Sequence, residues 1–403
     1  MDFDSVTFFL DDIAVWQSWF TDTLGFVFPS AQAHASLHPH TKQSIHAISS
    51  DLSGTLRHKP IQVRLASSSD TAPDVEHYLN HHPPGVADVG FRVKDLDHAY
   101  GRAIQAGAKP IQPITTTHLP GKTVNQATVS GWGDLRHTLT EYIDHPNPQS
   151  PRSATSYLYS SEHRSSRPDS AQTPTLRPPQ HAAPDFSAID HVVINVPCGE
   201  MEQASAWYER AFGFTYRQTF AIQTPYSGLR SVVMVHPDGN ATLPINEPAS
   251  PHSQIQEFLD VNQGTGVQHI ALSTPNIVQT IMALREKGLA FLSVPSSYYE
   301  QLPIRPGFQP SPIDWGAIAQ QGILVDWQND VPDALLFQIF TQPIFKEPTF
   351  FFEIIQRQSY FNGIQYQRAE GFGEGNFQAL FEAIEREQQK RGSLPLSTVE
   401  EHS

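Results

Sequence analysis

Apolar residues recur along the chain in short alternating runs, each followed by a longer run with helical spacing. GVADVGFRV precedes LDHAYGRAIQAG, which ends at Gly107, and GVQHIALST precedes IVQTIMALREKG, which ends at Gly288. Alternation predicts a strand, because successive side chains of a strand point to opposite faces. Ile277, Ile281 and Leu284 supply the apolar stripe of a helix. Each unit is therefore predicted to be a strand and an amphipathic helix, with a glycine ending the helix.

A matching pair of segments opens each half of the chain. FDSVTFFL leads into WQSWFTDTLGF, and IDHVVINV leads into ASAWYERAFGF. Each half also ends in a strand that carries a glutamate, LTEYID with Glu141 and FFEIIQ with Glu353. The repetition predicts that the chain is duplicated. We expect an α+β fold in which duplicated βαβββ modules form two open half-barrel domains with outer helices.

Residues 146–185 interrupt this pattern. The stretch is rich in proline, serine, arginine and glutamine and has almost no apolar periodicity, a composition typical of a linker. It divides the 403 residues into an N-terminal domain, 1–145, and a C-terminal domain, 186–403. That length is sufficient for two domains with buried cores.

Composition excludes several classes of protein. A formal charge of −15 argues against a nucleic-acid-binding protein, since no basic stripe is present to neutralise phosphates. The single cysteine, Cys198, excludes internal disulfides and thiolate metal sites. The N-terminus has acids where a secretory signal has basic residues, and no apolar run approaches the roughly 20 residues that span a bilayer. We expect a cytoplasmic enzyme with no nucleic-acid or membrane partner.

Three polar residues interrupt apolar strands in the second half: His191 in IDHVVINV, His269 in VQHIALS and Glu353 in FFEIIQ. A buried carboxylate needs a cation or strong hydrogen bonds, and one shared metal accounts for all three side chains. Two imidazoles and a carboxylate are the ligand set of non-haem iron(II) oxygenases. Their spacing defines no local motif, however. A lone strand histidine is more often a core residue, and a lone glutamate can pair with an arginine, so these alternatives stay open here.

From Ile189 onward the chain resembles the catalytic domain of the 4-hydroxyphenylpyruvate dioxygenase family, which belongs to the vicinal-oxygen-chelate superfamily. The similar segments occur in the family's order and cover most of residues 189–390. They are IDHVVINV, SGLRS, LPINEP, SQIQEFLDVNQGTGVQHIAL, REKGLAFLSVPSSYY, GILVDW, LLFQIFTQP, FFEIIQR and GFGEGNFQALFEAIE. The N-terminal half is similar more loosely, through HHPPGVADVGFRV and GDLRHTLTEY.

The resemblance implies that His191, His269 and Glu353 hold Fe(2+). It also implies a pocket whose residues fall into two groups. Those expected to act on the substrate during catalysis are Gln254, Asn246, Ser231, Gln338 and Phe377. Those expected to bind it are Pro244, Gln268, Phe340, Phe351 and Phe372. The segment GFGEGNF leads, in the family, into a C-terminal helix that covers the pocket mouth, so Phe372 and Phe377 are expected to gate it.

The activity that the resemblance implies converts 4-hydroxyphenylpyruvate and O2 to homogentisate and CO2. The reaction combines oxidative decarboxylation, ring hydroxylation and side-chain migration. Proteins of this family are commonly homo-oligomers, so the resemblance also implies a dimer or a tetramer. The use of the homogentisate, in tyrosine catabolism or in tocopherol or pigment synthesis, stays open.

Three other functions compete with this interpretation. Hydroxymandelate synthase uses the same fold, iron and substrate but hydroxylates the benzylic carbon; LPINEP and the phenylalanine of GNF favour the ring-hydroxylating enzyme. An extradiol ring-cleaving dioxygenase shares the fold class and the type of triad. A non-catalytic small-molecule-binding member of the superfamily needs no metal. In the N-terminal half the ligand positions align with Ser5, Asp88 and Glu141, and without an imidazole we expect no iron site there.

Overall fold

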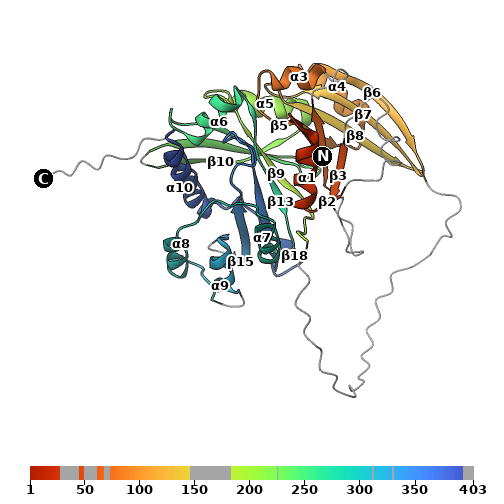
Figure 1. Ribbon diagram of the computed structural model, residues 1–403. Helices are drawn as coiled ribbons and strands as arrows, with labels where there is room; N and C mark the ends of the chain where they lie inside the picture. Colours follow the sequence, from red (N-terminus) through yellow and green to blue (C-terminus); the bar gives the residue numbers. More distant parts are fainter. Residues whose placement is uncertain are drawn as a thin grey trace, which may run out of the picture.

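The computed structural model describes residues 1–27, 45–49, 61–67, 73–145, 183–224, 226–310, 313–328 and 331–393. Two curved eight-stranded sheets lie side by side, one in each half of the chain (Figure 1). Most of the predicted linker, residues 146–182, lies outside the described residues. None of the helices in the described part of the chain is long and apolar enough to cross a membrane.

The N-terminal half contains a sheet in the order β2-β3-β4-β1-β5-β8-β7-β6. Its central strands, β1 and β5, are antiparallel to each other, and each pairs in parallel with the last strand of its own module. The elements are β1 (Asp2–Leu10), α1 (Ile13–Asp22), β2 (Phe26–Val27), β3 (Ile45–Ser49), β4 (Gln62–Ser67), α3 (Pro73–Leu79), β5 (Gly85–Arg92), α4 (Leu96–Gln105), β6 (Pro110–Leu119), β7 (Lys122–Ser130) and β8 (Arg136–Asp144).

The C-terminal half repeats this arrangement, with the sheet order β10-β11-β12-β9-β13-β16-β15-β14. The elements of its two modules are β9 (Ala188–Asn195), α5 (Met201–Phe212), β10 (Thr215–Gln223), β11 (Gly228–Val235), β12 (Thr242–Pro248), α6 (Gln254–Asn262), β13 (Gly266–Ser273), α7 (Ile277–Glu286), α8 (Ser296–Gln301), η1 (Leu302–Ile304), α9 (Trp315–Gln321), β14 (Leu324–Gln328), β15 (Val331–Phe340) and β16 (Phe351–Arg357). A short hairpin, β17 (Ser359–Phe361) and β18 (Tyr366–Arg368), precedes α10 (Glu374–Arg391).

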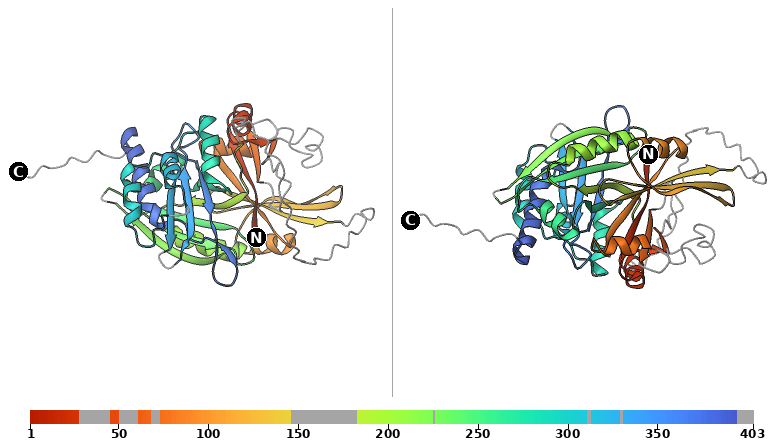
Figure 2. Two further views of the ribbon diagram at one scale, coloured as in Figure 1. Left: turned by 90° about the horizontal axis from the view of Figure 1, so that it is seen from below. Right: turned by 90° about the horizontal axis from the view of Figure 1, so that it is seen from above.

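Strand for strand, the two sheets have the same order, which confirms the predicted duplication of βαβββ modules. The curled, open sheets of Figure 2 are the expected half-barrels. The glycines that were predicted to follow the repeated helices, Gly107 and Gly288, both have positive φ, as helix ends require. The C-terminal half also has elements without a counterpart in the N-terminal half, among them α10, which lies along its outer edge (Figure 1).

One continuous apolar core joins the two halves. Phe8 of β1 packs edge-on against Phe350, with ring centroids 5.2 Å apart, and Phe91 lies 5.8 Å from Phe214. Buried polar groups add to this contact, since His137 Nε2 lies 3.1 Å from the hydroxyl of Tyr208. Each half was expected to bury a core of its own. The structure instead places apolar residues of both halves in the same cluster, so the halves stabilise each other.

Candidate metal centre and substrate pocket

Three neighbouring strands at the centre of the C-terminal sheet bring His191, His269 and Glu353 together. In the register, Ala271 of β13 lies beside His191 of β9 on one side and beside Glu353 of β16 on the other. His269 is two residues before Ala271, so its side chain is on the same face. The small side chain of Ala271 leaves room between the imidazole and the carboxylate. Residues far apart in the chain therefore meet because the module topology makes their strands adjacent.

The ligand atoms of these three residues all lie within 4.8 Å of one another. Glu353 Oε2 is 3.2 Å from His191 Nε2 and 3.5 Å from His269 Nε2. All three residues are buried, with exposed fractions of 3% for His191, 7% for His269 and 1% for Glu353. Such a facial set of two imidazoles and one carboxylate is the donor set that a divalent iron ion takes.

The outer faces of both imidazoles are held by oxygen acceptors. His191 Nδ1 lies 3.0 Å from Asp190 Oδ1, and His269 Nδ1 lies 3.3 Å from Gln268 Oε1. An imidazole that donates from Nδ1 has its Nε2 lone pair free for a metal, and such outer partners are typical of metal-binding histidines. The residues present therefore fit an ion at this position.

Electrostatics at the centre favour a positive charge. Burial by itself raises the pKa of Glu353, but the charge of His191 and hydrogen bonds from both imidazoles lower it below the usual value. Burial lowers the pKa of His191, yet Glu353 and Asp190 raise it overall. The pKa of His269 stays lowered by burial. The carboxylate is thus held ionised in an apolar region, where a cation compensates its charge.

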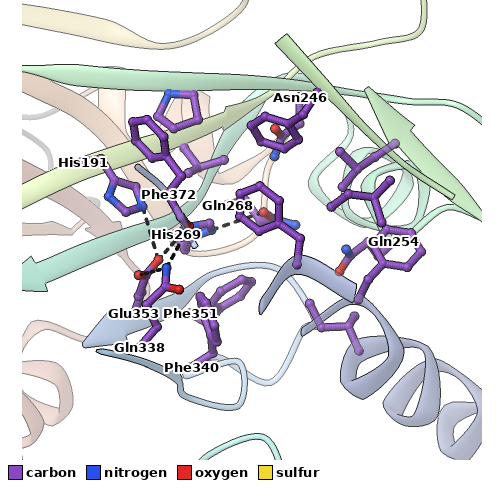
Figure 3. Close-up of a pocket in the computed structure, with 18 residues that line it drawn as sticks. His191, Asn246, Gln254, Gln268, His269, Gln338, Phe340, Phe351, Glu353 and Phe372 are labelled. Atoms are coloured by element: carbon purple, nitrogen blue, oxygen red, sulfur yellow. Dashed lines mark hydrogen bonds and ion pairs between the residues drawn. The ribbon is translucent and has the colours of Figure 1, made fainter. Parts of the chain in front are cut away.

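A pocket extends from the metal centre between the sheet and α10. Figure 3 shows the two imidazoles and Glu353 at one end and Gln254, the first residue of α6, at the other. Aromatic rings form much of the wall. Phe351 stacks on the ring of His269 with centroids 4.8 Å apart, and Phe377 of α10 stacks on Phe220 at 4.5 Å.

Nearly all of the residues predicted for the pocket line it. Gln268 and His269 both do so although they are consecutive, because the register shifts between Val267 and His269. The predicted residues that line the pocket are His191, Pro244, Asn246, Gln254, Gln268, His269, Gln338, Phe340, Phe351, Glu353, Phe372 and Phe377.

Ser231 is placed differently from the prediction. It lies directly opposite Asn246 in the register of β11 and β12, but it is fully buried and is not among the residues that line the pocket. Its hydroxyl has no hydrogen-bond partner within the described part of the chain. Ser231 is therefore paired with a residue that lines the pocket but does not itself reach the pocket surface.

Several lining residues were not predicted from the sequence. Strand and helix periodicity places some of them on the same face as a predicted residue. Val193 is two residues from His191 along a strand, and Phe381 follows Phe377 by one helical turn. The additional lining residues are Val193, Phe220, Ile222, Leu229, Phe381 and Ile384. Polar partners behind the ligands were missed as well, above all Arg357, which binds Asp190.

The N-terminal half has no imidazole at the positions that correspond to the three ligands. The register pairs Phe91 with Leu139, as it pairs Leu272 with Ile354 in the other half, so Thr138 occupies the position of Glu353. The sequence alignment had placed Glu141 there. This assignment was wrong by three residues. The alignment matched Glu141 to Glu353 although the two strands differ in length. The hydroxyl and the amide of Thr138 donate to Asp88, which closes the site with internal hydrogen bonds.

Comparisons with known proteins agree with this architecture. The model of the Glyoxalase/Bleomycin resistance protein/Dioxygenase superfamily matches residues 188–302, the part that contains two of the three ligands. An uncharacterized protein of Synechocystis is 34% identical over 335 residues, which are 83% of this chain and 86% of that protein. The 4-hydroxyphenylpyruvate dioxygenase of Danio rerio is 38% identical over 337 residues, 81% of this chain and 78% of that protein.

Among solved structures, a mutant of 4-hydroxymandelate synthase from Streptomyces coelicolor is similar with a TM-score of 0.70 and 26% identity. The match covers 96% of this chain and 98% of that one. The fold and the two-histidine, one-carboxylate centre define a dioxygenase-type protein of the vicinal-oxygen-chelate class. Within that class, the chain belongs to the 4-hydroxyphenylpyruvate dioxygenase family.

Proposed function

We propose that the protein converts 4-hydroxyphenylpyruvate and O2 to homogentisate and CO2. The observation that carries this proposal is the position of a buried two-histidine, one-carboxylate centre at the base of a pocket walled by phenylalanines. The named relatives support the choice of substrate. In this proposal His191, His269 and Glu353 hold iron(II) and leave positions free for the 2-oxo acid and O2. When bound there, iron(II) supplies the redox chemistry that activates O2.

The side chains of the pocket position the substrate and exclude water from it. Phe351 and Phe377, on opposite elements, offer ring faces to the aromatic ring of the substrate, and offset ring contacts contribute roughly 0.5–1.5 kcal/mol each beyond area burial. At the far end, Gln254 Oε1 is buried and has no hydrogen-bond partner within the described residues. We assign it the phenol hydroxyl, since a buried acceptor without a donor is costly. The carboxylate end then lies at the metal centre.

Further parts of the proposal concern the whole chain. Residues 186–403 form the catalytic domain, with a C-terminal helix that gates the pocket, and residues 1–145 form a domain without a metal site. Homo-oligomers, a dimer or a tetramer, and a cytoplasmic location stay predictions. Phe372 and Phe377 are the gating residues, because they belong to the helix and the segment that precedes it.

The second candidate is a 4-hydroxymandelate synthase, which is favoured by the likeness to the Streptomyces coelicolor structure. Anaerobic loading of the full chain with iron(II), followed by product analysis with 4-hydroxyphenylpyruvate and O2, separates the two. Homogentisate is the expected product. Formation of 4-hydroxymandelate supports the second candidate, and iron binding without any product contradicts both. Failure to bind iron supports the non-catalytic alternative, and consumption of catechols supports an extradiol dioxygenase.

A further inference from the structure

One arginine holds the segment that connects the short hairpin to α10. Arg357 is the last residue of β16, four residues after Glu353. Its Nη1 donates to the carbonyl oxygen of Gly371 at 2.8 Å and to that of Ala369 at 3.2 Å. The segment of residues 369–372, which leads into the gating helix, is therefore attached to the end of a ligand-bearing strand.

The opposite edge of the same guanidinium binds Asp190, the carboxylate that accepts a hydrogen bond from His191. Arg357 Nε lies 2.8 Å from Asp190 Oδ2, and Arg357 Nη2 lies 2.7 Å from Asp190 Oδ1. Such a bidentate pair fixes the plane of the carboxylate. Asp190 Oδ1 also lies 3.0 Å from His191 Nδ1, so the orientation of the imidazole depends on that carboxylate. Both partners are nearly buried, with side-chain exposures of 11% and 10%.

A second link joins the segment to the carboxylate ligand. Gln338 Nε2 donates to Glu353 Oε1 and to the carbonyl oxygen of Phe372, both at 2.9 Å. The ring of Phe372 lies 5.7 Å from that of His191 and also approaches the guanidinium of Arg357. Residues 369–372 are thus connected to the residues that orient His191 and Glu353. A segment that only anchored the helix would not need contacts with those residues.

We propose that Arg357 is a positioning residue that couples the docking of residues 369–372 to the orientation of the His191 imidazole. When the segment is docked, the guanidinium is held and the aspartate presents the imidazole to the ion. Because binding free energies are reciprocal, an ion at the centre must in turn stabilise the docked segment. This inference rests on the proposed metal centre but not on the identity of the substrate.

The test compares the metal affinity and the amide exchange of the full chain and of an Arg357→Gln variant. Metal affinity is measured by anaerobic titration with iron(II) and, as a spectroscopic probe, with cobalt(II). We expect roughly 10- to 100-fold weaker binding in the variant, as is typical when an outer partner of a ligand is lost. Bound metal should slow hydrogen exchange of the amides at residues 369–376 in the natural protein and have much less effect in the variant.

Arg391→Gln is the matched control. Arg391 ties the far end of α10 to Glu257, with Nη2 to Oε2 at 2.9 Å, and contacts no partner of a ligand. It should leave the metal affinity and the metal-dependent protection of residues 369–376 unchanged. A double variant, Asp190→Asn with Arg357→Gln, should lose little more affinity than either single variant, because both act through the same imidazole.

The outcomes distinguish this inference from the proposed function. Natural affinity in the Arg357→Gln variant, or equal loss in the Arg391→Gln control, overturns the coupling alone. Metal binding with the expected coupling but without homogentisate contradicts only the proposed activity. A natural protein that binds neither iron(II) nor cobalt(II) overturns both.

Discussion

Gln338 donates a hydrogen bond of 2.9 Å to Glu353 Oε1, the carboxylate oxygen that does not face the imidazoles. Both residues are buried, at 2% and 1% exposure. The amide oxygen of Gln338 in turn accepts from Asn376 of α10 at 3.0 Å. This glutamine therefore fixes which carboxylate oxygen is directed to the metal centre.

Replacing Gln338 with methionine should weaken metal binding roughly 10- to 100-fold, because the carboxylate loses the partner that orients it. The side chain keeps its length, so the packing of β15 is largely retained. Anaerobic iron(II) titration measures the change. Gln342→Met, at an exposed position just beyond the same strand, is the control and should bind iron normally. Unchanged affinity in Gln338→Met would mean that the hydrogen bond has no part in holding the ligand.

Metal binding should stabilise the fold, and this stabilisation should require His269. A ligand that binds only the folded state at 100 times its dissociation constant adds about 2.7 kcal/mol to the free energy of unfolding. We expect that gain for the natural protein with iron(II) under anaerobic conditions. The His269→Ala variant should unfold at the same denaturant concentration with or without iron. Asp88→Ala, in the closed site of the N-terminal half, should be less stable but keep the full iron-dependent gain.

Gln254 should discriminate substrates by their hydroxyl group. If its Oε1 accepts from the phenol, Gln254→Leu should lower kcat/KM for 4-hydroxyphenylpyruvate by up to about tenfold, the effect of one hydrogen bond of 0.5–1.5 kcal/mol. The same variant should change kcat/KM for phenylpyruvate, which lacks that hydroxyl, much less. Equal losses on both substrates would show that Gln254 acts through the shape of the pocket instead.

Much of the fold was predictable because its signals are local and repeated. The alternation in GVADVGFRV and GVQHIALST, followed by helical spacing and a glycine, specifies the same unit twice. The residue types at His191, His269 and Glu353 could also be recognised, since polar side chains in apolar strands are costly. Their convergence on one point was not legible from spacing. It depends on β9, β13 and β16 being neighbours, which follows from the resemblance and from the duplicated topology.

The outer partners of the ligands could not be predicted for a physical reason. Arg357 and Asp190 are separated by most of the C-terminal half, and nothing in either local sequence marks them as a pair. Ser231 shows the opposite failure. It is paired with Asn246 across the two strands, but whether a side chain on that face reaches the pocket is decided by the packing around it and not by strand parity.

The structure changes how gating should be tested. Deletion of residues 372–403 would remove the predicted gate, and a role confined to gating would leave iron binding intact. Phe381 of α10, however, belongs to a buried apolar cluster with Ile255 and Phe258, and Phe372 accepts a hydrogen bond from Gln338. Deletion would expose that cluster and disturb the metal centre as well, so a point variant is the sharper experiment.

Phe377→Ala removes the ring that stacks on Phe220 and leaves the rest of α10 in place. We expect kcat/KM for 4-hydroxyphenylpyruvate to fall between about twofold and tenfold, as loss of one aromatic contact of 0.5–1.5 kcal/mol implies. Iron affinity should not change. Phe361→Ala, at an exposed position of β17, is the control and should behave as the natural protein. A large fall in iron affinity in Phe377→Ala would contradict a role confined to the substrate.

Gly373 is the residue that precedes α10, and it lies against Gln338. Its φ is +79°, and a Cβ there would lie 1.8 Å from Gln338 Oε1. Gly373→Ala should therefore displace the glutamine that orients Glu353 and weaken iron binding, in addition to a backbone cost of about 1–2 kcal/mol.

Gly392, at the other end of the same helix, separates these two effects. It also has φ +79°, but among the described residues a Cβ there would meet nothing within 4 Å. Gly392→Ala should show only the backbone cost, measured as a lower free energy of unfolding, with unchanged iron affinity. Because the two substitutions share the helix, the side chain and the φ value, a difference in iron affinity isolates the contact with Gln338. Equal iron affinities would mean that the start of α10 can move away from Gln338 without consequence for the ligands.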